Sequence, residues 1–510
     1  MMRKVLVIGI DGASWDVLNP MIQSGCMPRL QHAVQKGFSG TLLSTEPPIT
    51  PTAWTSFQTG LPAHEHNVLG FRSFFMENGR FRSSILFSSS MRSRHIWRIL
   101  SDHGRRVCIL NLPLTYPPFP VNGILVSGFP VPSGDAEYTF PPEFKKELYD
   151  IVPGFKVMQS GIGADQKEMQ IEEIVDRWSA MMFQKARLAI HLLRREPWDV
   201  FMVHIQESDL IQHYLWPCMD PSDPAHRIED FVRVAAFYSR LDRLAGEIID
   251  EGNSRGFSVM LLSDHGFQRC RHIVKINNWL HRKGCLVLRK DAKRMVVSTI
   301  KRIMDLPALH KWKSTMKHSA VKAAATNQYL GSVIDYEKTV AFVETNATHV
   351  AFLHLLTADS LVCNRIIDEI KALTDPGGAG LVRTVSELEG PGNRRKIVFA
   401  DGVAAAGIVP DGKPWLETPI PFKQHVGMHH RSGVIILDDT FEPSRMPLEI
   451  FEVPALIMSR QRIPFDPLKS DGRMTGSLEK TKGAFASFGS SDADKERGEV
   501  EEQLRGLGYL

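Results

Sequence analysis

The sequence is poor in cysteine, with six among 510 residues. They stand at the scattered positions 26, 108, 218, 270, 285 and 363, and none forms a CxxC pair. This spacing argues against a disulfide framework and against a thiolate zinc site. It favours free thiols in a reducing compartment, and we therefore expect the protein to be cytoplasmic.

Long hydrophobic runs are also lacking. The first apolar run, residues 5–10, is ended by Asp11, whereas a membrane-spanning helix needs about 20 apolar residues. No later segment approaches that length. The sequence therefore predicts neither a signal peptide nor a membrane span.

Charge of one sign is not in excess. The 61 Lys and Arg residues against 57 Asp and Glu residues give a net charge of +4. This excess is too small, among so many charges, to indicate a nucleic-acid-binding protein. The composition, 43% hydrophobic and 23% charged, is that of an ordinary globular protein.

What the sequence does contain is an alternation of short apolar runs and longer helix-like segments. Strands are expected at residues 4–10, 40–44, 107–112, 199–205, 257–263, 340–344, 396–400 and 434–437. Helices are expected at residues 28–36, 93–103, 171–194 and 228–250. This order predicts an α/β fold with a central, mostly parallel sheet flanked by helices. Ligands of such sheets bind at the carboxyl ends of the strands.

Two regions differ in composition from the rest. Residues 286–323 carry ten Lys or Arg against two Asp, which fits either a solvated helix surface or an electropositive lid over an anionic substrate. After about residue 470 the chain is poor in apolar residues. We therefore expect a catalytic core in two parts, 1–280 and 339–466, separated by a basic helical cap, 281–338, and followed by a mobile tail, 467–510.

Acidic residues and histidines follow several of the expected strands. Asp11 ends the first strand in GIDG, which lacks the GxGxxG spacing of a dinucleotide site. Asp209 and His213 are four residues apart and share one face of a helix. Asp264 and His265 follow the strand at 257–263. Taken singly, each has a structural alternative, such as a helix cap.

A histidine cluster precedes the last expected strand, with His425, His429 and His430 in QHVGMHHRSG. Alone, it would indicate polar residues on the protein surface. Together with the acidic residues, however, it supplies the carboxylate and imidazole ligands of a zinc or manganese site. Six such ligands suffice for two metals, an arrangement suited to in-line displacement at phosphorus.

The stretch TPTAWTSFQTG at residues 50–60 has two interpretations. In the first, Thr50 or Thr52 caps a helix that Gly60 ends. In the second, one threonine is a nucleophile at a helix N-terminus, where backbone N–H groups favour negative charge. The metal-ligand pattern favours the second.

The order of these motifs (IDG, T…TG…P…H, DxxxH, SDHG, GxH) resembles that of the alkaline phosphatase superfamily. Within it, the sequence is most similar to the type I phosphodiesterase/nucleotide pyrophosphatase-like family, over most of residues 1–465. NLPLTYPP at 111–118 and VSGFPVPS at 126–133 resemble segments of its predicted bacterial and archaeal phosphohydrolases. The resemblance implies an alkaline-phosphatase-like sandwich with an inserted helical cap.

The resemblance also implies site residues. The family's nucleophile lies nine residues before the threonine of TG, which gives Thr50 here, with Thr52 as the alternative. One metal would be held by the residues Asp11, Asp264, His265 and Thr50, and the other by Asp209, His213 and His429. His430 is the alternative to His429 if the register is shifted. The metals implied are two divalent ions, zinc first and manganese second.

The activity implied is that of a metal-dependent phosphohydrolase, first a phosphodiesterase, acting through a phosphothreonine on a small phosphorylated substrate. A phosphomutase or phosphomonoesterase would share these ligands, and a non-catalytic metal-binding protein is a further alternative. The asparagine that nucleotide pyrophosphatases place three residues after the nucleophile is Ala53 here, which weakens the case for nucleotide substrates.

Overall fold

The structure is a computed structural model of the whole chain. It describes residues 2–77, 80–91, 94–132, 135–157, 170–289, 333–345, 348–388, 392–407, 414–421, 425–443, 445–468, 496–501 and 503–504. Most of the expected basic cap and residues 469–495 of the expected tail lie outside these ranges. The proposed domain boundaries therefore stay predictions.

The largest sheet of the described residues has nine strands, in the order β20-β2-β19-β9-β1-β8-β5-β6-β7. They are β1 (Lys4–Ile10), β2 (Phe38–Leu43), β5 (Val107–Leu110), β6 (Gly123–Val126), β7 (Thr139–Phe140), β8 (Val200–Ile205), β9 (Phe257–Leu262), β19 (Ser432–Leu437) and β20 (Leu448–Glu449). The five central strands β9, β1, β8, β5 and β6 pair in parallel. The α/β fold with a mostly parallel sheet is confirmed.

Strand β1 shows why the sheet is covered on both faces. Its alternate residues Leu6 and Ile8 belong to one apolar cluster and Val5 and Val7 to the other, because successive side chains of a strand point to opposite faces. All four are fully buried. A strand buried on both faces needs the continuous apolar run that the sequence has here.

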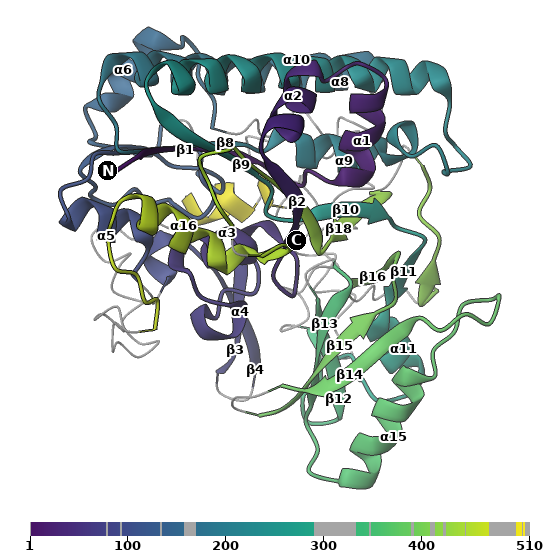
Figure 1. Cartoon of the computed structure of the whole chain (residues 1–510). Helices are drawn as coiled ribbons and strands as arrows, with labels where there is room; N and C mark the ends of the chain where they lie inside the picture. The colour runs from purple at the N-terminus through teal and green to yellow at the C-terminus, as the bar shows by residue number, and fades with distance from the viewer. Residues whose placement is uncertain are drawn as a thin grey trace.

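Helices cover the two faces as separate layers (Figure 1). One layer holds α1 (Trp15–Gln23), α2 (Pro28–Lys36), α6 (Phe144–Ile151), α8 (Ile171–Arg195), α9 (Glu207–Met219) and α10 (Ile228–Ser254). The other holds α3 (Thr50–Thr59), α5 (Ile96–Asp102) and α16 (Val453–Arg460), with α4 (Ala63–His66) after α3. The expected helix at 28–36 has the predicted bounds.

A second group of elements, in which most strand pairs are antiparallel, lies below the main sheet in Figure 1. It contains the sheet β12-β13-β15-β14, formed by Ala341–Thr345, Val350–Leu355, Asn393–Phe399 and Val382–Glu387, with the helices α11 (Ile276–Arg282) and α15 (Ser360–Lys371). A three-stranded sheet joins β16 (Val403–Ala406), β11 (His272–Lys275) and β17 (Leu416–Glu417). These elements share their own apolar cluster. The expected strands at 340–344 and 396–400 therefore belong to the four-stranded sheet, as β12 and β15, and not to the central sheet.

Two further antiparallel pairs of strands form sheets of their own. Strands β10 (Gly266–Arg269) and β18 (Gly427–His430) pair antiparallel beside the carboxyl edge of the main sheet. The hairpin β3 (Arg72–Glu77) and β4 (Arg80–Ile85) reaches the four-stranded sheet, where the Phe81 ring lies 4.9 Å from that of Phe342.

The last described residues, 496–501, 503 and 504, pack against the main core. Val500 and Leu504 are fully buried, and Glu501 pairs at 3.0 Å with the buried Arg72 of the hairpin. The Tyr116 hydroxyl donates a hydrogen bond of 3.2 Å to Glu496. The described end of the segment predicted as a mobile tail is therefore docked.

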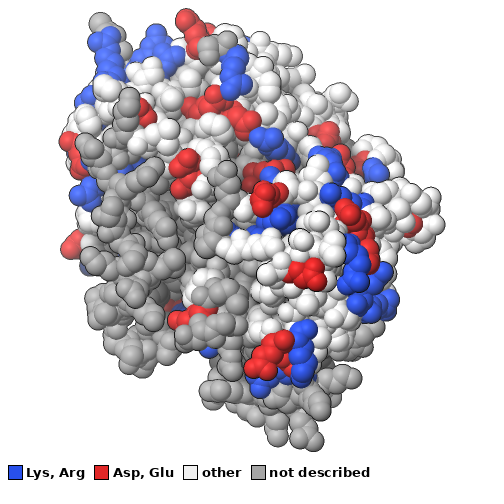
Figure 2. Space-filling model, turned by 90° about the horizontal axis from the view of Figure 1, so that it is seen from below, with Lys and Arg blue, Asp and Glu red and all other residues white. Residues whose placement is uncertain are grey.

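Basic and acidic side chains are intermixed over the described residues on the face that Figure 2 shows from below. This agrees with the small net charge of the chain.

Among the helices in the described ranges, none is both long and apolar enough to cross a membrane.

Candidate metal centre

The predicted site residues come from five segments that meet at the carboxyl edge of the sheet. Asp11 follows β1 and Asp264 follows β9, its neighbour in the sheet. Asp209 and His213 lie on α9, which begins directly after β8, the neighbour of β1 on the other side. Thr50 is the first residue of α3, and the segments β10 and β18 bring His265 and His429 together.

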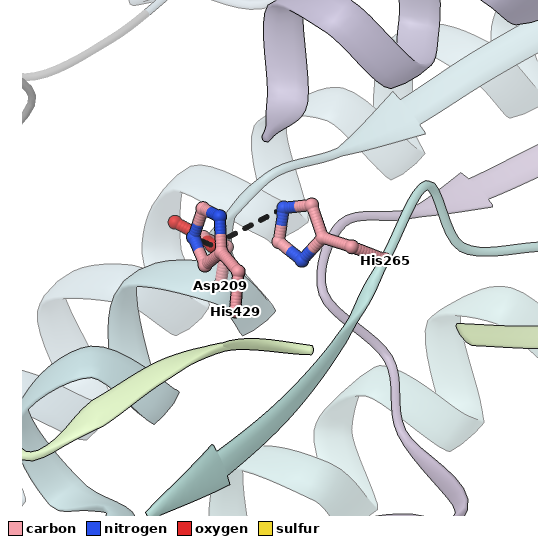
Figure 3. A group of neighbouring side chains, drawn as sticks. All are labelled: Asp209, His265 and His429. Carbon is pink, nitrogen blue, oxygen red and sulfur yellow. Dashed lines mark ion pairs between the residues drawn. The ribbon is translucent and has the colours of Figure 1, made fainter. Parts of the chain in front are cut away.

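One group of side chains surrounds Asp209. Its Oδ1 lies 3.1 Å from His429 Nε2 and 3.5 Å from His213 Nε2. The two histidine Nε2 atoms are 3.0 Å apart. Figure 3 shows Asp209 and His429 side by side with the His265 ring facing them; His265 Nε2 is 3.9 Å from Asp209 Oδ1.

A second group surrounds His265. Its Nε2 lies 3.2 Å from Asp264 Oδ2, 3.5 Å from Asp11 Oδ1 and 3.3 Å from the Thr50 hydroxyl oxygen. The Thr50 oxygen is 3.5 Å from the same Asp11 Oδ1. All four residues are fully buried. The two groups are adjacent, and His265 belongs to both.

Backbone carbonyls orient all three histidines in the same way. The Nδ1 atoms of His213, His265 and His429 lie 3.1, 3.2 and 3.0 Å from the carbonyl oxygens of Gly427, Gly266 and Pro48. A carbonyl oxygen only accepts hydrogen bonds, so each Nδ1 must carry the proton. In the neutral rings, the Nε2 atoms that face the carboxylates then carry lone pairs, as metal ligands do.

The residues present fit divalent cations. Two Nε2 lone pairs at 3.0 Å, beside a carboxylate oxygen, repel one another unless a positive charge lies among them. Asp264 Oδ2, among the described residues, has no hydrogen-bond donor although it is buried. Carboxylate and imidazole together suit zinc and manganese.

Burial shifts the pKa values of these groups. Burial raises the pKa of Asp264 well above its usual value, and the charge of Asp11 adds to the effect. Burial also raises the pKa of Asp11, with Asp209 as the next cause. The pKa of His213 is lowered to about 4 by burial. Protons and cations therefore compete for the same oxygen atoms, while His213 stays neutral and ready to bind a metal.

The structure separates Thr50 from Thr52. The N-cap of α3 is Ile49, without a side-chain hydrogen bond, so the capping interpretation of either threonine is wrong. The Thr50 hydroxyl faces Asp11 and His265. The Thr52 hydroxyl, although buried, has no hydrogen-bond partner among the described residues.

The remaining hydroxyls of α3 have structural roles. Thr55 donates to the Pro51 carbonyl at 2.6 Å and Thr59 to the Thr55 carbonyl at 2.8 Å. Ser56 pairs at 2.8 Å with His66 Nε2. A helix that is buried on all sides satisfies its hydroxyls in this way.

Strand alternation places the two adjacent histidines on opposite sides of β18. His429 is buried and faces Asp209. His430 Nδ1 instead accepts a hydrogen bond from Ser432 N at 3.2 Å. The third histidine of the cluster, His425, stacks against the His213 ring with centroids 4.8 Å apart.

The backbone conformation at position 12 explains why a glycine follows Asp11. Its φ of +68° lies in the left-handed region, and an added Cβ would come within 2.5 Å of the Phe267 ring. Its N–H donates to Asp264 Oδ1 at 3.1 Å. Only glycine adopts this left-handed conformation and fits so close to the Phe267 ring without strain.

Two residues near the site were missed by sequence reasoning. His204 Nε2 lies 2.9 Å from Asp11 Oδ2, and Trp54 Nε1–H donates to the same oxygen at 3.3 Å. The signal available for His204 was a polar residue near the carboxyl end of a buried strand, DVFMVHI. Trp54 gave no signal, because an apolar position on a buried helix is already expected to hold an aromatic residue.

An α/β sheet with buried carboxylates and imidazoles gathered at its carboxyl edge fits a metal-dependent hydrolase. Residues 5–349 match the family described as Type I phosphodiesterase / nucleotide pyrophosphatase. The chain belongs to this family and is a metal-dependent phosphoester hydrolase. His429 is the one predicted ligand beyond the matched residues.

Solved structures show the same fold. Phosphonoacetate hydrolase from Sinorhizobium meliloti 1021, in complexes with phosphonoformate and with phosphonoacetate, is 14% identical, with a TM-score of 0.54 and coverage of 90% of this chain and 96% of that one. Human ectonucleotide pyrophosphatase / phosphodiesterase 5 is 13% identical, with a TM-score of 0.50 and coverage of 91% and 96%. No curated protein matches the sequence significantly.

Proposed function

We propose that this chain hydrolyses small phosphate diesters, with Thr50 as the nucleophile. The observation that carries the proposal is the position of the Thr50 hydroxyl oxygen, 3.5 Å from Asp11 Oδ1 and 3.3 Å from His265 Nε2. Among the described residues, no other hydroxyl of α3 contacts a predicted metal ligand. A nucleophile must lie within such reach of its activating group.

The proposal includes two cation positions. Asp11, Asp264, His265 and the Thr50 oxygen would hold one ion, and Asp209, His213 and His429 the other; the mixed carboxylate and imidazole set favours zinc, with manganese second. When bound, such ions lower the pKa of the attacking hydroxyl and stabilise the charge of the leaving oxygen.

The chain's own residues supply position and exclude water. Thr50 sits at the N-terminal end of α3, where the helix dipole favours negative charge on its oxygen. The Thr50 oxygen gives up its proton and forms a bond to phosphorus as the bond to the leaving alcohol, which takes up a proton, breaks. The product is a phosphothreonine that keeps the second ester group. Water then cleaves the bond between Thr50 and phosphorus, which releases a phosphate monoester and restores the hydroxyl. Burial of every group in the site strengthens these electrostatic interactions.

A comparison of bis-p-nitrophenyl phosphate with p-nitrophenyl phosphate, with added zinc or manganese, tests the proposal. We expect turnover of the diester to exceed that of the monoester. The reverse ratio would identify a phosphomonoesterase, and phosphate transfer to an acceptor without net hydrolysis would identify a phosphomutase. If neither substrate shows metal-dependent turnover, the remaining interpretation is a non-catalytic metal-binding protein. Asp209→Asn is the matched negative control, because it changes one atom and weakens one ion position.

The proposed location follows from the thiols. All six cysteines are free, and five of them are buried. Free thiols persist in reducing compartments, which supports placing the protein in the cytoplasm.

A further inference from the structure

Asp11 presents its two oxygen atoms to different surroundings. Oδ1 faces the Thr50 hydroxyl and His265 Nε2, at 3.5 Å from each. Oδ2 is turned the other way, toward His204 Nε2 at 2.9 Å and Trp54 Nε1 at 3.3 Å. Oδ1 therefore faces the other predicted ligands, and Oδ2 faces the surrounding protein.

His204 is itself fixed in place. Its Nδ1 lies 3.1 Å from the carbonyl oxygen of Asn111, at the end of β5. The Trp54 ring packs edge-on against the imidazole, with centroids 4.9 Å apart. His204 is fully buried, so its ring has no freedom to turn away from Asp11.

Both contacts fall on the same oxygen atom of Asp11. His204 Nε2 lies 2.9 Å from Oδ2, with the proton of this contact on either atom according to the tautomer. Trp54 Nε1–H donates to Oδ2 at 3.3 Å. With Oδ2 engaged by both residues, Oδ1 is the atom left for a cation.

We infer that His204, assisted by Trp54, is a positioning residue for the ion held by Asp11. It fixes the rotation of the carboxylate so that Asp11 binds through Oδ1, the oxygen beside Thr50. The inference rests on the proposed function and adds to it a residue that touches neither substrate nor the reacting atoms. Partners behind a metal ligand commonly set metal affinity by a factor of about 10–100.

The test measures zinc affinity, with a chromophoric chelator as competitor. In an Asp209→Asn background, which weakens the Asp209 position, zinc binds first at the Asp11 position, and His204→Phe should weaken zinc there about 10- to 100-fold. His204→Gln retains an amide donor and should stay within about threefold of the parent. In an Asp264→Asn background, which leaves the Asp209 position, His204→Phe should change nothing.

His66→Gln is the matched control. His66 is also a buried histidine bound to a hydroxyl of α3, at Ser56, but it touches no predicted ligand. We expect it to lower the melting temperature without changing either zinc affinity. Hydrolysis by His204→Phe should recover when the zinc concentration is raised, a rescue that a purely structural defect would not show.

The outcomes separate this inference from the proposed function. Fewer than two zinc ions on the wild type would contradict the two-metal centre. Two ions on the wild type, with equal affinity at the Asp11 position in His204→Phe and its parent, would contradict the role of His204 alone. If His204→Phe does not fold, Trp54→Phe removes the other hydrogen bond to Oδ2 and should weaken zinc at the Asp11 position only; no change there would also overturn the inference.

Discussion

The Nε2 atoms of His213 and His429 lie 3.0 Å apart in the buried centre. Their Nδ1 atoms face the carbonyl oxygens of Gly427 and Pro48, so in the neutral rings lone pairs meet at this contact. Asp209 Oδ1 completes the group, 3.1 Å from His429. Electron-rich atoms held this closely favour a bound cation over its absence.

The first prediction concerns removal of the metal. Because the repulsion among these groups returns without an ion, EDTA should lower the melting temperature and zinc should restore it. Ions present at about 1,000 times their dissociation constant would stabilise the fold by about 4 kcal/mol per site. Differential scanning calorimetry with and without chelator measures the change. Identical curves would count against both ion positions.

The second prediction concerns the nucleophile. Thr50→Ala should reduce diester hydrolysis on the order of 10³-fold or more, because no other hydroxyl of α3 faces the ligands. Thr52→Ala is the matched control, two residues further along the same helix, and should retain most activity. Steady-state kinetics measures both, and circular dichroism checks the fold. The opposite ranking would make Thr52 the nucleophile.

The third prediction concerns stability in acid. His66 Nδ1 accepts a hydrogen bond from Val68 N at 3.1 Å, and burial lowers the pKa of His66 to about 3. Between that value and the ordinary pKa near 6.5, the unfolded state binds one more proton at this residue, so stability falls as pH falls. In the His66→Gln variant no group titrates at this position, so the unfolded state does not bind the additional proton. Urea unfolding from pH 7 to pH 4 should therefore show a weaker loss of stability in the variant than in the wild type; equal slopes would contradict the shift.

The fourth prediction concerns the docked end of the chain. Leu504 is fully buried in the main core, and Leu504→Ala should lower the free energy of unfolding by about 2–5 kcal/mol. Leu468 is 64% exposed, and Leu468→Ala should change it by less than about 0.5 kcal/mol. Urea titration distinguishes the two variants. An equal, small effect of both would mean that residues 496–501, 503 and 504 do not pack as described.

Much of the fold could be predicted from local pattern. Residues 4–10 form a continuous apolar run, and residues 28–36 form a helix with the predicted bounds, because burial on both faces and helical periodicity leave direct marks on the sequence. The pair Asp209 and His213 was also readable, since a spacing of four places both side chains on one face of a helix.

Local sequence pattern was enough to predict which residue types reach the carboxyl edge of the sheet. Which atoms meet there depends on the packing of the folded chain. The pairing of β18 with β10 turns His429, and not His430, toward Asp209. His204 reaches Asp11 across 193 residues, and Leu504 enters a core made by distant segments. Such contacts depend on the packing of elements far apart in the chain, and local periodicity carries no record of them.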